Sequence, residues 1–186
     1  MRRLFCAVDV PANKEIRNAV SFLEKSISGQ KIKWVDPGKY HITLKFFGST
    51  EERKIQEIVV ALEKCAKKAS PFSFIIEGCG FFGKKDSPSV IWLGVKNTAG
   101  LFYLYSQVNS AIRPLGYLPE KPVFVPHLTI GRIKHSTGNV ETERLIEGLG
   151  NKALATIKVD SFSLMESLLM PQGPQYNVVE RFSLNY

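Results

Sequence analysis

The sequence predicts an α+β protein in which two antiparallel β-sheets face a central cleft and carry helices on their outer faces. Strand-like and helix-like segments are mixed along the chain without strict alternation, which disfavours a parallel sheet. A His-aliphatic-Thr-aliphatic pattern occurs twice, 86 positions apart (127 − 41) in a chain of 186 residues. Apolar residues make up 44% of the chain, so there is enough material for a packed core.

Three segments carry apolar residues at helical spacing and are expected to be amphipathic helices. The three stripes are Ile16, Ala19, Val20, Leu23 and Ile27; Ile55, Ile58, Val59, Leu62 and Ala66; and Leu101, Leu104, Tyr105, Val108 and Ile112. We expect Thr50 to cap the second helix, and Pro114 with Gly116 to end the third. A weaker fourth helix is expected at about 140–149.

Segments rich in β-branched and aromatic residues predict the strands. They are residues 2–10, 31–35, 40–47, 72–82, 89–95, 127–134, 153–166 and 175–184. Residues 78–84, Gly-Cys-Gly-Phe-Phe-Gly-Lys, match much of a phosphate-binding loop. That motif needs a helix directly after it, whereas a strand-like segment follows here, so we interpret it as part of a hairpin.

The two halves of the chain resemble each other around the repeated pattern. Residues 34–40 lead into His41, and residues 124–126 lead into His127. This spacing predicts an internal duplication with pseudo-twofold symmetry. No low-complexity tract or long linker separates the halves, so we interpret residues 1–186 as one bilobal domain.

Charge and cysteine usage narrow the class of partner and the compartment. The net charge of +8 and the pI near 9.4 indicate a polyanionic partner such as nucleic acid, although a merely soluble basic protein is the alternative. Cys6, Cys65 and Cys79 are odd in number and widely spaced, which indicates a reducing cytoplasm. No stretch approaches the length of a membrane span, so we expect no membrane partner. We expect a monomer.

The first repeated pattern is expected to present an imidazole beside a hydroxyl. Alternate residues of a strand share a face, so His41 and Thr43 should project together while Ile42, Leu44 and Phe46 point into the core. The second pattern should do the same with His127 and Thr129. Two such strands facing each other would place two imidazoles and two hydroxyl groups around one small space.

Such a constellation suits the cleavage of a phosphodiester without a metal. An ordinary imidazole pKa of about 6.5 lets one histidine be neutral while its partner is protonated near neutral pH. The neutral ring would take a proton from the attacking oxygen, and the charged ring would give one to the leaving oxygen. Threonine hydroxyls could bond the non-bridging oxygens, where charge collects in the transition state.

These residue types also have other common roles in proteins. A single histidine on a strand is usually structural, but the duplication argues against that for both. Two histidines could hold zinc, yet a third protein ligand is usual and no zinc motif is present.

Lys45 shares parity with His41 and is expected at the edge of the same face. Arg132 has the opposite parity to His127, although Gly131 could introduce a bulge that re-aims it. For both cations the alternative is a solvated surface charge.

Four segments carry a resemblance to a known family. They are the opening strand at residues 3–8, the first motif at 34–48, the second motif at 126–132 and a closing segment at 165–176. On these the sequence resembles the RNA 2',3'-cyclic phosphodiesterases, also called 2'-5' RNA ligases, within the two-histidine phosphoesterases. Ser89 departs from the family, whose members often carry arginine there.

The resemblance implies hydrolysis of a terminal 2',3'-cyclic phosphate on RNA to a 2'-phosphomonoester, with no metal or cofactor. His41 and His127 would be the catalytic acid and base, in an order left open, and Thr43 and Thr129 would bind substrate. Arg132 matches the arginine of the second motif and would bind phosphate. Two alternatives remain: a 2'-5' ligase that joins tRNA halves with the same residues, and a non-catalytic RNA-binding module.

Overall fold

The computed structural model describes residues 1–27, 31–84, 87–119, 123–135, 142–171 and 173–185. The strands are β1 (Arg2–Asp9), β2 (Lys31–Trp34), β3 (His41–Thr50), β4 (Phe72–Lys84), β5 (Ser87–Lys96), β6 (His127–His135), β7 (Ala153–Val159), β8 (Ser161–Met170) and β9 (Gly173–Ser183). The helices are α1 (Lys14–Ser26), α2 (Glu52–Ala66), α3 (Ala99–Ile112) and α4 (Thr142–Leu149), with short 3₁₀ turns η1 (Pro37–Lys39) and η2 (Arg113–Leu115).

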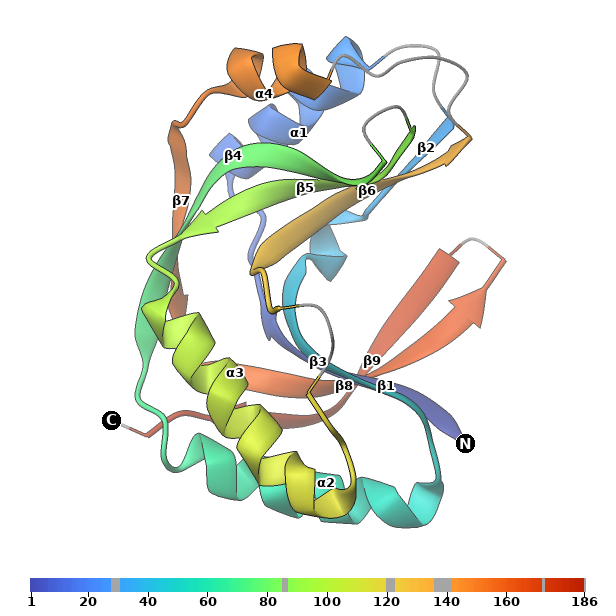
Figure 1. Ribbon diagram of the computed structural model, residues 1–186, viewed down its shortest axis with the longest axis vertical. Coiled ribbons are helices and arrows are strands. Elements are labelled where there is room, and N and C mark those ends of the chain that lie inside the picture. Colours follow the sequence, from blue (N-terminus) through green and yellow to red (C-terminus); the bar gives the residue numbers. More distant parts are fainter. Residues whose placement is uncertain (28–30, 85–86, 120–122, 136–141, 172, 186) are drawn as a thin grey trace.

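The strands form two antiparallel sheets, so the predicted α+β class is confirmed. One sheet has four strands in the order β3-β1-β8-β9, and the other has five in the order β2-β6-β5-β4-β7. Helices α1 and α4 cover the five-stranded sheet, and α2 and α3 lie on the far side of the four-stranded sheet (Figure 1). The two sheets therefore face each other with the helices outside. No helix in the described part of the chain is long and apolar enough to cross a membrane.

The two sheets repeat one strand pattern. The order β3-β1-β8-β9 corresponds to β6-β5-β4-β7, which places the two histidine-bearing strands, β3 and β6, in equivalent positions. Strand β2 extends the five-stranded sheet beside β6, and no strand of the described residues is its counterpart in the other sheet. Because β4 of the first half joins the second half's sheet, and β8 and β9 join the first half's, the halves are interlaced. This supports the single-domain interpretation of residues 1–186, which stays a prediction.

The predicted helices are present, with one error at a helix start. Asn13 caps α1 by accepting a hydrogen bond from the backbone of Ile16 (2.8 Å). Thr50 does not cap α2: it is the last residue of β3, and the cap position belongs to Glu51, whose side chain makes no capping bond. Gly116 follows α3 and η2 with a left-handed φ of 88°, as its predicted role as a terminator requires.

The predicted single strand at 153–166 is wrong, because the chain changes sheet within it. β7 pairs with β4 in the five-stranded sheet, whereas β8 pairs with β1 and β9 in the four-stranded sheet. Asp160 lies between them, and its carbonyl oxygen accepts a hydrogen bond from the Leu184 backbone (2.7 Å). The predicted hairpin at residues 78–84 is confirmed as part of the antiparallel β4–β5 pair.

Each sheet has a core face toward its helices and an inner face toward the other sheet. On β1, Leu4 and Cys6 belong to the hydrophobic core cluster. Phe5 and Ala7 are equally buried but lie outside that cluster, on the inner face. This alternation fixes which side chains of the neighbouring strands can reach the space between the sheets.

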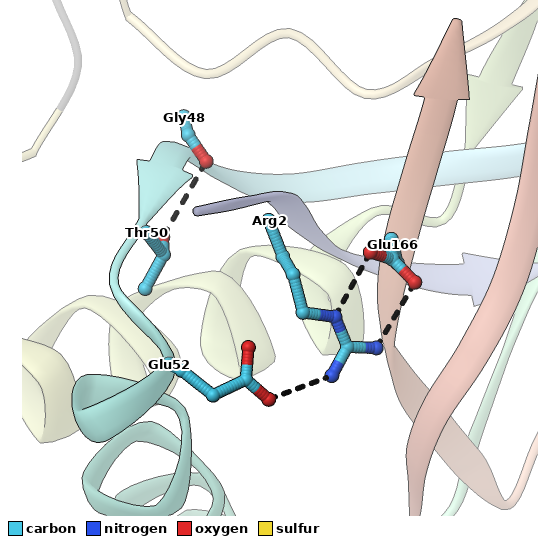
Figure 2. A network of polar contacts seen from close by, with 5 residues as sticks. All are labelled: Arg2, Gly48, Thr50, Glu52 and Glu166. Atoms are coloured by element: carbon cyan, nitrogen blue, oxygen red, sulfur yellow. Dashed lines mark hydrogen bonds and ion pairs between the residues drawn. The ribbon is translucent and has the colours of Figure 1, made fainter.

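An ion-pair network ties β1 to β8 and α2. The Arg2 guanidinium donates two hydrogen bonds to the Glu166 carboxylate (2.9 and 3.0 Å), and its remaining nitrogen lies 3.5 Å from Glu52 (Figure 2). The Glu166 side chain is only 14% exposed, whereas that of Glu52 is 74% exposed. The hydrogen bonds from Arg2 hold the pKa of Glu166 below its ordinary value.

We expect Glu166→Gln to lower the free energy of unfolding by about 1 kcal/mol near neutral pH, because it removes a bidentate pair. A carboxyl group with a depressed folded pKa stabilises the protein above its unfolded pKa, and this stabilisation is lost as the pH falls through the folded pKa. Urea unfolding of the two proteins should therefore converge in acid. Glu52→Gln is the control and should change little; an equal loss there would contradict the argument.

Candidate active site

The two motif histidines are held in the same way. The Nδ1 atom of His41 lies 2.8 Å from the Lys39 carbonyl oxygen, and Nδ1 of His127 lies 2.8 Å from the Val125 carbonyl oxygen. Because a carbonyl oxygen only accepts, each Nδ1 must carry the hydrogen. This tautomer leaves Nε2 of each ring as the atom that exchanges a proton.

Burial and nearby charges shift the pKa values of both imidazole rings. Burial lowers the pKa of His41 most, the charges of His127 and Arg132 lower it further, and the bond to Lys39 and the charge of Asp9 oppose this. Burial also lowers the pKa of His127; its bond to Val125 opposes this, and the charge of Arg132 adds to it. The charges of His127 and Arg132 therefore reach His41, and the charge of Arg132 reaches His127.

Each threonine lies on the inner face with its histidine. Pairing is uninterrupted from His41 to Thr43 against Asp9 to Ala7, and it is uninterrupted from His127 to Thr129 against β5. Alternate residues of these short stretches therefore share a face. The structure places both hydroxyls where the sequence predicted, and their role in binding substrate remains a proposal.

A β-bulge turns Arg132 to the inner face. Thr129 pairs with Trp92 and Gly131 pairs with Ile91, so Ile130 has no partner on β5. The extra residue reverses the alternation, leaves Gly131 buried on the core face, and brings Arg132 to the side of the histidines. The bulge expected near Gly131 is confirmed.

The parity argument for Lys45 is wrong, because β3 carries an equivalent bulge. Thr43 pairs with Ala7 and Lys45 pairs with Cys6, which skips Leu44. Lys45 thereby joins the core face, where it is 4% exposed and its ammonium donates to the Leu118 carbonyl oxygen (2.6 Å). This placement does not support Lys45 as a substrate-binding residue.

The same bulge corrects the prediction for Phe46, which does not point into the core. Phe46 is 56% exposed and pairs with Phe5 of the inner face, with their ring centroids 6.1 Å apart. Its position on β3 corresponds to that of Arg132 on β6, because each follows its motif threonine by three residues and one bulge. The pseudo-twofold site is therefore symmetric in histidine and threonine but sets an aromatic ring opposite a guanidinium.

Aromatic rings that are not among the predicted site residues pack on both histidines. Tyr176 meets His41 edge-on (5.4 Å, 87°), and Phe5 lies 5.1 Å from the same ring. Phe82 meets His127 edge-on (4.8 Å, 89°) and packs on Trp92 (5.2 Å). These contacts come from strands of each histidine's own sheet and fix the planes of the imidazoles. Parity along β4 and β9 is the sequence signal that could have indicated them.

Gly80 is required by the packing behind His127. A Cβ at this position would lie 2.2 Å from the Trp92 ring, so Gly80→Ala should displace the indole, and with it Phe82. We expect a loss of stability of about 1–3 kcal/mol and a changed near-ultraviolet circular dichroism spectrum. Gly148→Ala on α4, where the Cβ would meet only the Phe22 ring at 3.1 Å, is the matched control. An unchanged spectrum for Gly80→Ala would contradict the prediction.

Other features of the surface do not coincide with this site. A hollow of about 630 Å³ lies between α2 and α3 and is lined by residues such as Val60, Lys64 and Ala111. It contains none of the predicted site residues. Among the described residues, no three His, Cys, Asp or Glu side chains gather as a set of metal ligands.

Two imidazoles with free Nε2 atoms, flanked by hydroxyls and a guanidinium, form a site suited to acid–base cleavage of a phosphoester. A family model described as "LigT like Phosphoesterase" matches the chain twice, at residues 8–92 and 93–176. The chain belongs to the LigT-like phosphoesterase family, and the double match confirms the predicted internal duplication.

Curated relatives and solved structures agree with this assignment. An RNA 2',3'-cyclic phosphodiesterase of Thermotoga maritima is 38% identical over 95% of this chain and 92% of its own length. One from Methanothermobacter thermautotrophicus is 33% identical over 98% of both chains. The crystal structure of TT0787 from Thermus thermophilus matches with a TM-score of 0.78 and 27% identity, covering 98% of this chain and 97% of its own.

Proposed function

We propose that this chain hydrolyses terminal 2',3'-cyclic phosphates of RNA to 2'-phosphomonoesters, using His41 and His127 as a metal-independent acid–base pair. The observation that carries the proposal is that the two histidines have the same tautomer. Both Nδ1 atoms are held by backbone carbonyl oxygens, and both Nε2 atoms are left for proton transfer. The relatives named as RNA 2',3'-cyclic phosphodiesterases support the substrate class.

The reaction needs one proton removed and one delivered. One histidine takes a proton from water as the new P–O bond forms, and the other protonates O3' as the P–O3' bond breaks. Hydroxyls of Thr43 and Thr129 donate to the non-bridging oxygens, and the Arg132 guanidinium neutralises the charge that develops there. The preference for a 2'-phosphate product follows if O3' is the leaving oxygen.

One chain provides all the residues of the proposed site, which supports a monomeric enzyme. Both histidines and Arg132 come from one chain, so a single copy holds a complete site. The three cysteines are all buried and unpaired, which suits the reducing cytoplasm that we propose as its location. Ligation of tRNA halves would use the same proton transfers, with a 5'-hydroxyl RNA end in the place of water.

The test is product analysis on a short RNA that ends in a 2',3'-cyclic phosphate, with EDTA present. We expect a 2'-phosphomonoester as the product, identified by chromatography against 2'- and 3'-phosphate standards. Adding an RNA with a 5'-hydroxyl end measures ligation in the same assay. A 3'-phosphate product would overturn the assigned leaving oxygen, and no reaction with intact RNA binding would favour the binding-module alternative.

A further inference from the structure

Strand β2 breaks the symmetry of the two halves and adds a cation to one side of the site. Its residue Lys33 pairs directly with Arg132 on β6, so the two side chains share the inner face. Neighbouring strands lie about 5 Å apart. Lys33 on β2 therefore places a second positive charge one strand beyond Arg132, on the side away from the histidines. Among the described residues, the four-stranded sheet has no strand in the corresponding place.

A second cation, Lys39, contacts the start of β9 next to Lys33. The end of the Lys33 side chain lies so close to Gly173 that a Cβ there would overlap its Nζ and Cε atoms. The ammonium of Lys39 donates to the carbonyl oxygen of the next residue, Pro174 (3.1 Å). Two residues further along, Tyr176 packs on His41. The start of β9 therefore leads from the two lysines to the catalytic pair.

Carboxylates of the described residues do not neutralise the positive charge along this path. Within the part of the chain that the structure describes, Lys33, Lys39 and Arg132 form no ion pair with a carboxylate. Burial raises the pKa of Tyr176, and the charges of Arg132 and Arg3 oppose that rise, so Arg132 also acts on this end of the path. Adjacent uncompensated cations on one face favour a ligand with more than one negative charge.

We propose that Lys33 and Lys39 form a subsite for the phosphodiester on the 5' side of the terminal nucleotide, so that the enzyme selects RNA chains over cyclic mononucleotides. The inference rests on the proposed function, because it assumes that the terminal cyclic phosphate lies at Arg132 and the histidines. An ammonium is a compact charge without the fork of a guanidinium, so it suits a backbone phosphate in any sequence. The subsite would read the presence of a chain and not its bases.

The experiment compares kcat/KM for a cyclic mononucleotide and for a short RNA with the same terminal nucleotide. Lys33→Met keeps the apolar stem and removes the charge; Lys33 is preferred to Lys39 because the Lys39 backbone holds His41. We expect Lys33→Met to lower kcat/KM for the short RNA roughly 3- to 10-fold through KM, and to leave the mononucleotide unchanged. Lys64→Met on α2, which removes the same charge from the outer surface, is the matched control.

Binding provides a readout that does not depend on turnover. The affinity of Lys33→Met for a short RNA ending in a 2'-phosphate should depend less on salt, with the slope of log K against log salt reduced by about 0.7. If the wild type cleaves neither substrate, the proposed function fails, and this slope still decides the subsite. An equal loss for both substrates, or a slope equal to that of Lys64→Met, would overturn the subsite while leaving the proposed function intact.

Discussion

Replacing either His41 or His127 with alanine is expected to lower kcat on the order of 10³-fold, because each removes one of the two proton transfers. RNA affinity should fall only a few-fold, since the cations that bind phosphate remain. The variants are compared with the wild type by turnover of a cyclic-phosphate RNA and by direct binding of the 2'-phosphate product. A combined variant should be little worse than either single one, because the two groups act as a unit.

Asparagine at the same positions separates chemistry from support. Its amide nitrogen can replace Nδ1 as the donor to the Lys39 or Val125 carbonyl oxygen, but it provides nothing at Nε2. We therefore expect His41→Asn and His127→Asn to be as inactive as the alanine variants and closer to wild type in thermal stability. Substantial turnover by either asparagine variant would show that the histidine acts through its structural hydrogen bond and not by proton transfer.

The pattern of alternating residues correctly predicted which side chains share a face up to each threonine, and it failed just after it. The uninterrupted pairing of His41 with Thr43, and of His127 with Thr129, is a local property of a strand, so sequence parity is sufficient. A bulge depends on the partner strand, which is distant in sequence. Gly131 gave a hint of the bulge on β6, whereas Leu44–Lys45 gave none on β3, and Lys45 was therefore placed on the wrong face.

Contacts between distant segments account for the other differences. The buried apolar positions change parity at the change of sheet, from Ile157 and Val159 in β7 to Phe162 and Leu164 in β8, and the partner strands of these two segments are distant in sequence. Strand β9 comes from the second half of the sequence but joins the sheet of His41, and β4 comes from the first half but joins the sheet of His127. Tyr176 and Phe82 reach the histidines for this reason. Most of the secondary structure and the placement of the two histidines were therefore predictable, but the aromatic rings around them depended on the interlaced topology.

Arg132 is expected to have the second largest effect, through its hydrogen bonds and through its charge. Arg132→Gln should lower kcat/KM about 10²-fold, because the guanidinium is the one cation that acts on both histidines among the interactions found in the described residues. Its positive charge disfavours protonated imidazole and so contributes to the lowered pKa of His41 and of His127. Removing that charge should raise both values, and both limbs of the pH–rate profile should move to higher pH.

Arg132→Lys separates the two contributions. Lysine keeps the charge, so the limbs of the profile should stay near those of the wild type, but it lacks the planar fork that bonds two phosphate oxygens, so kcat/KM should still fall. The three proteins are compared by kcat/KM for a cyclic mononucleotide across the acid and neutral range, where a substrate with a single phosphate keeps Lys33 out of the comparison. In the wild type the maximum of the pH–rate profile should lie on the acid side of the ordinary imidazole pKa. Burial lowers the pKa values of both histidines, and the charge of Arg132 adds to that shift. Limbs that do not move in Arg132→Gln would mean that the guanidinium lies too far from the rings to tune them, and would leave phosphate binding as its only role.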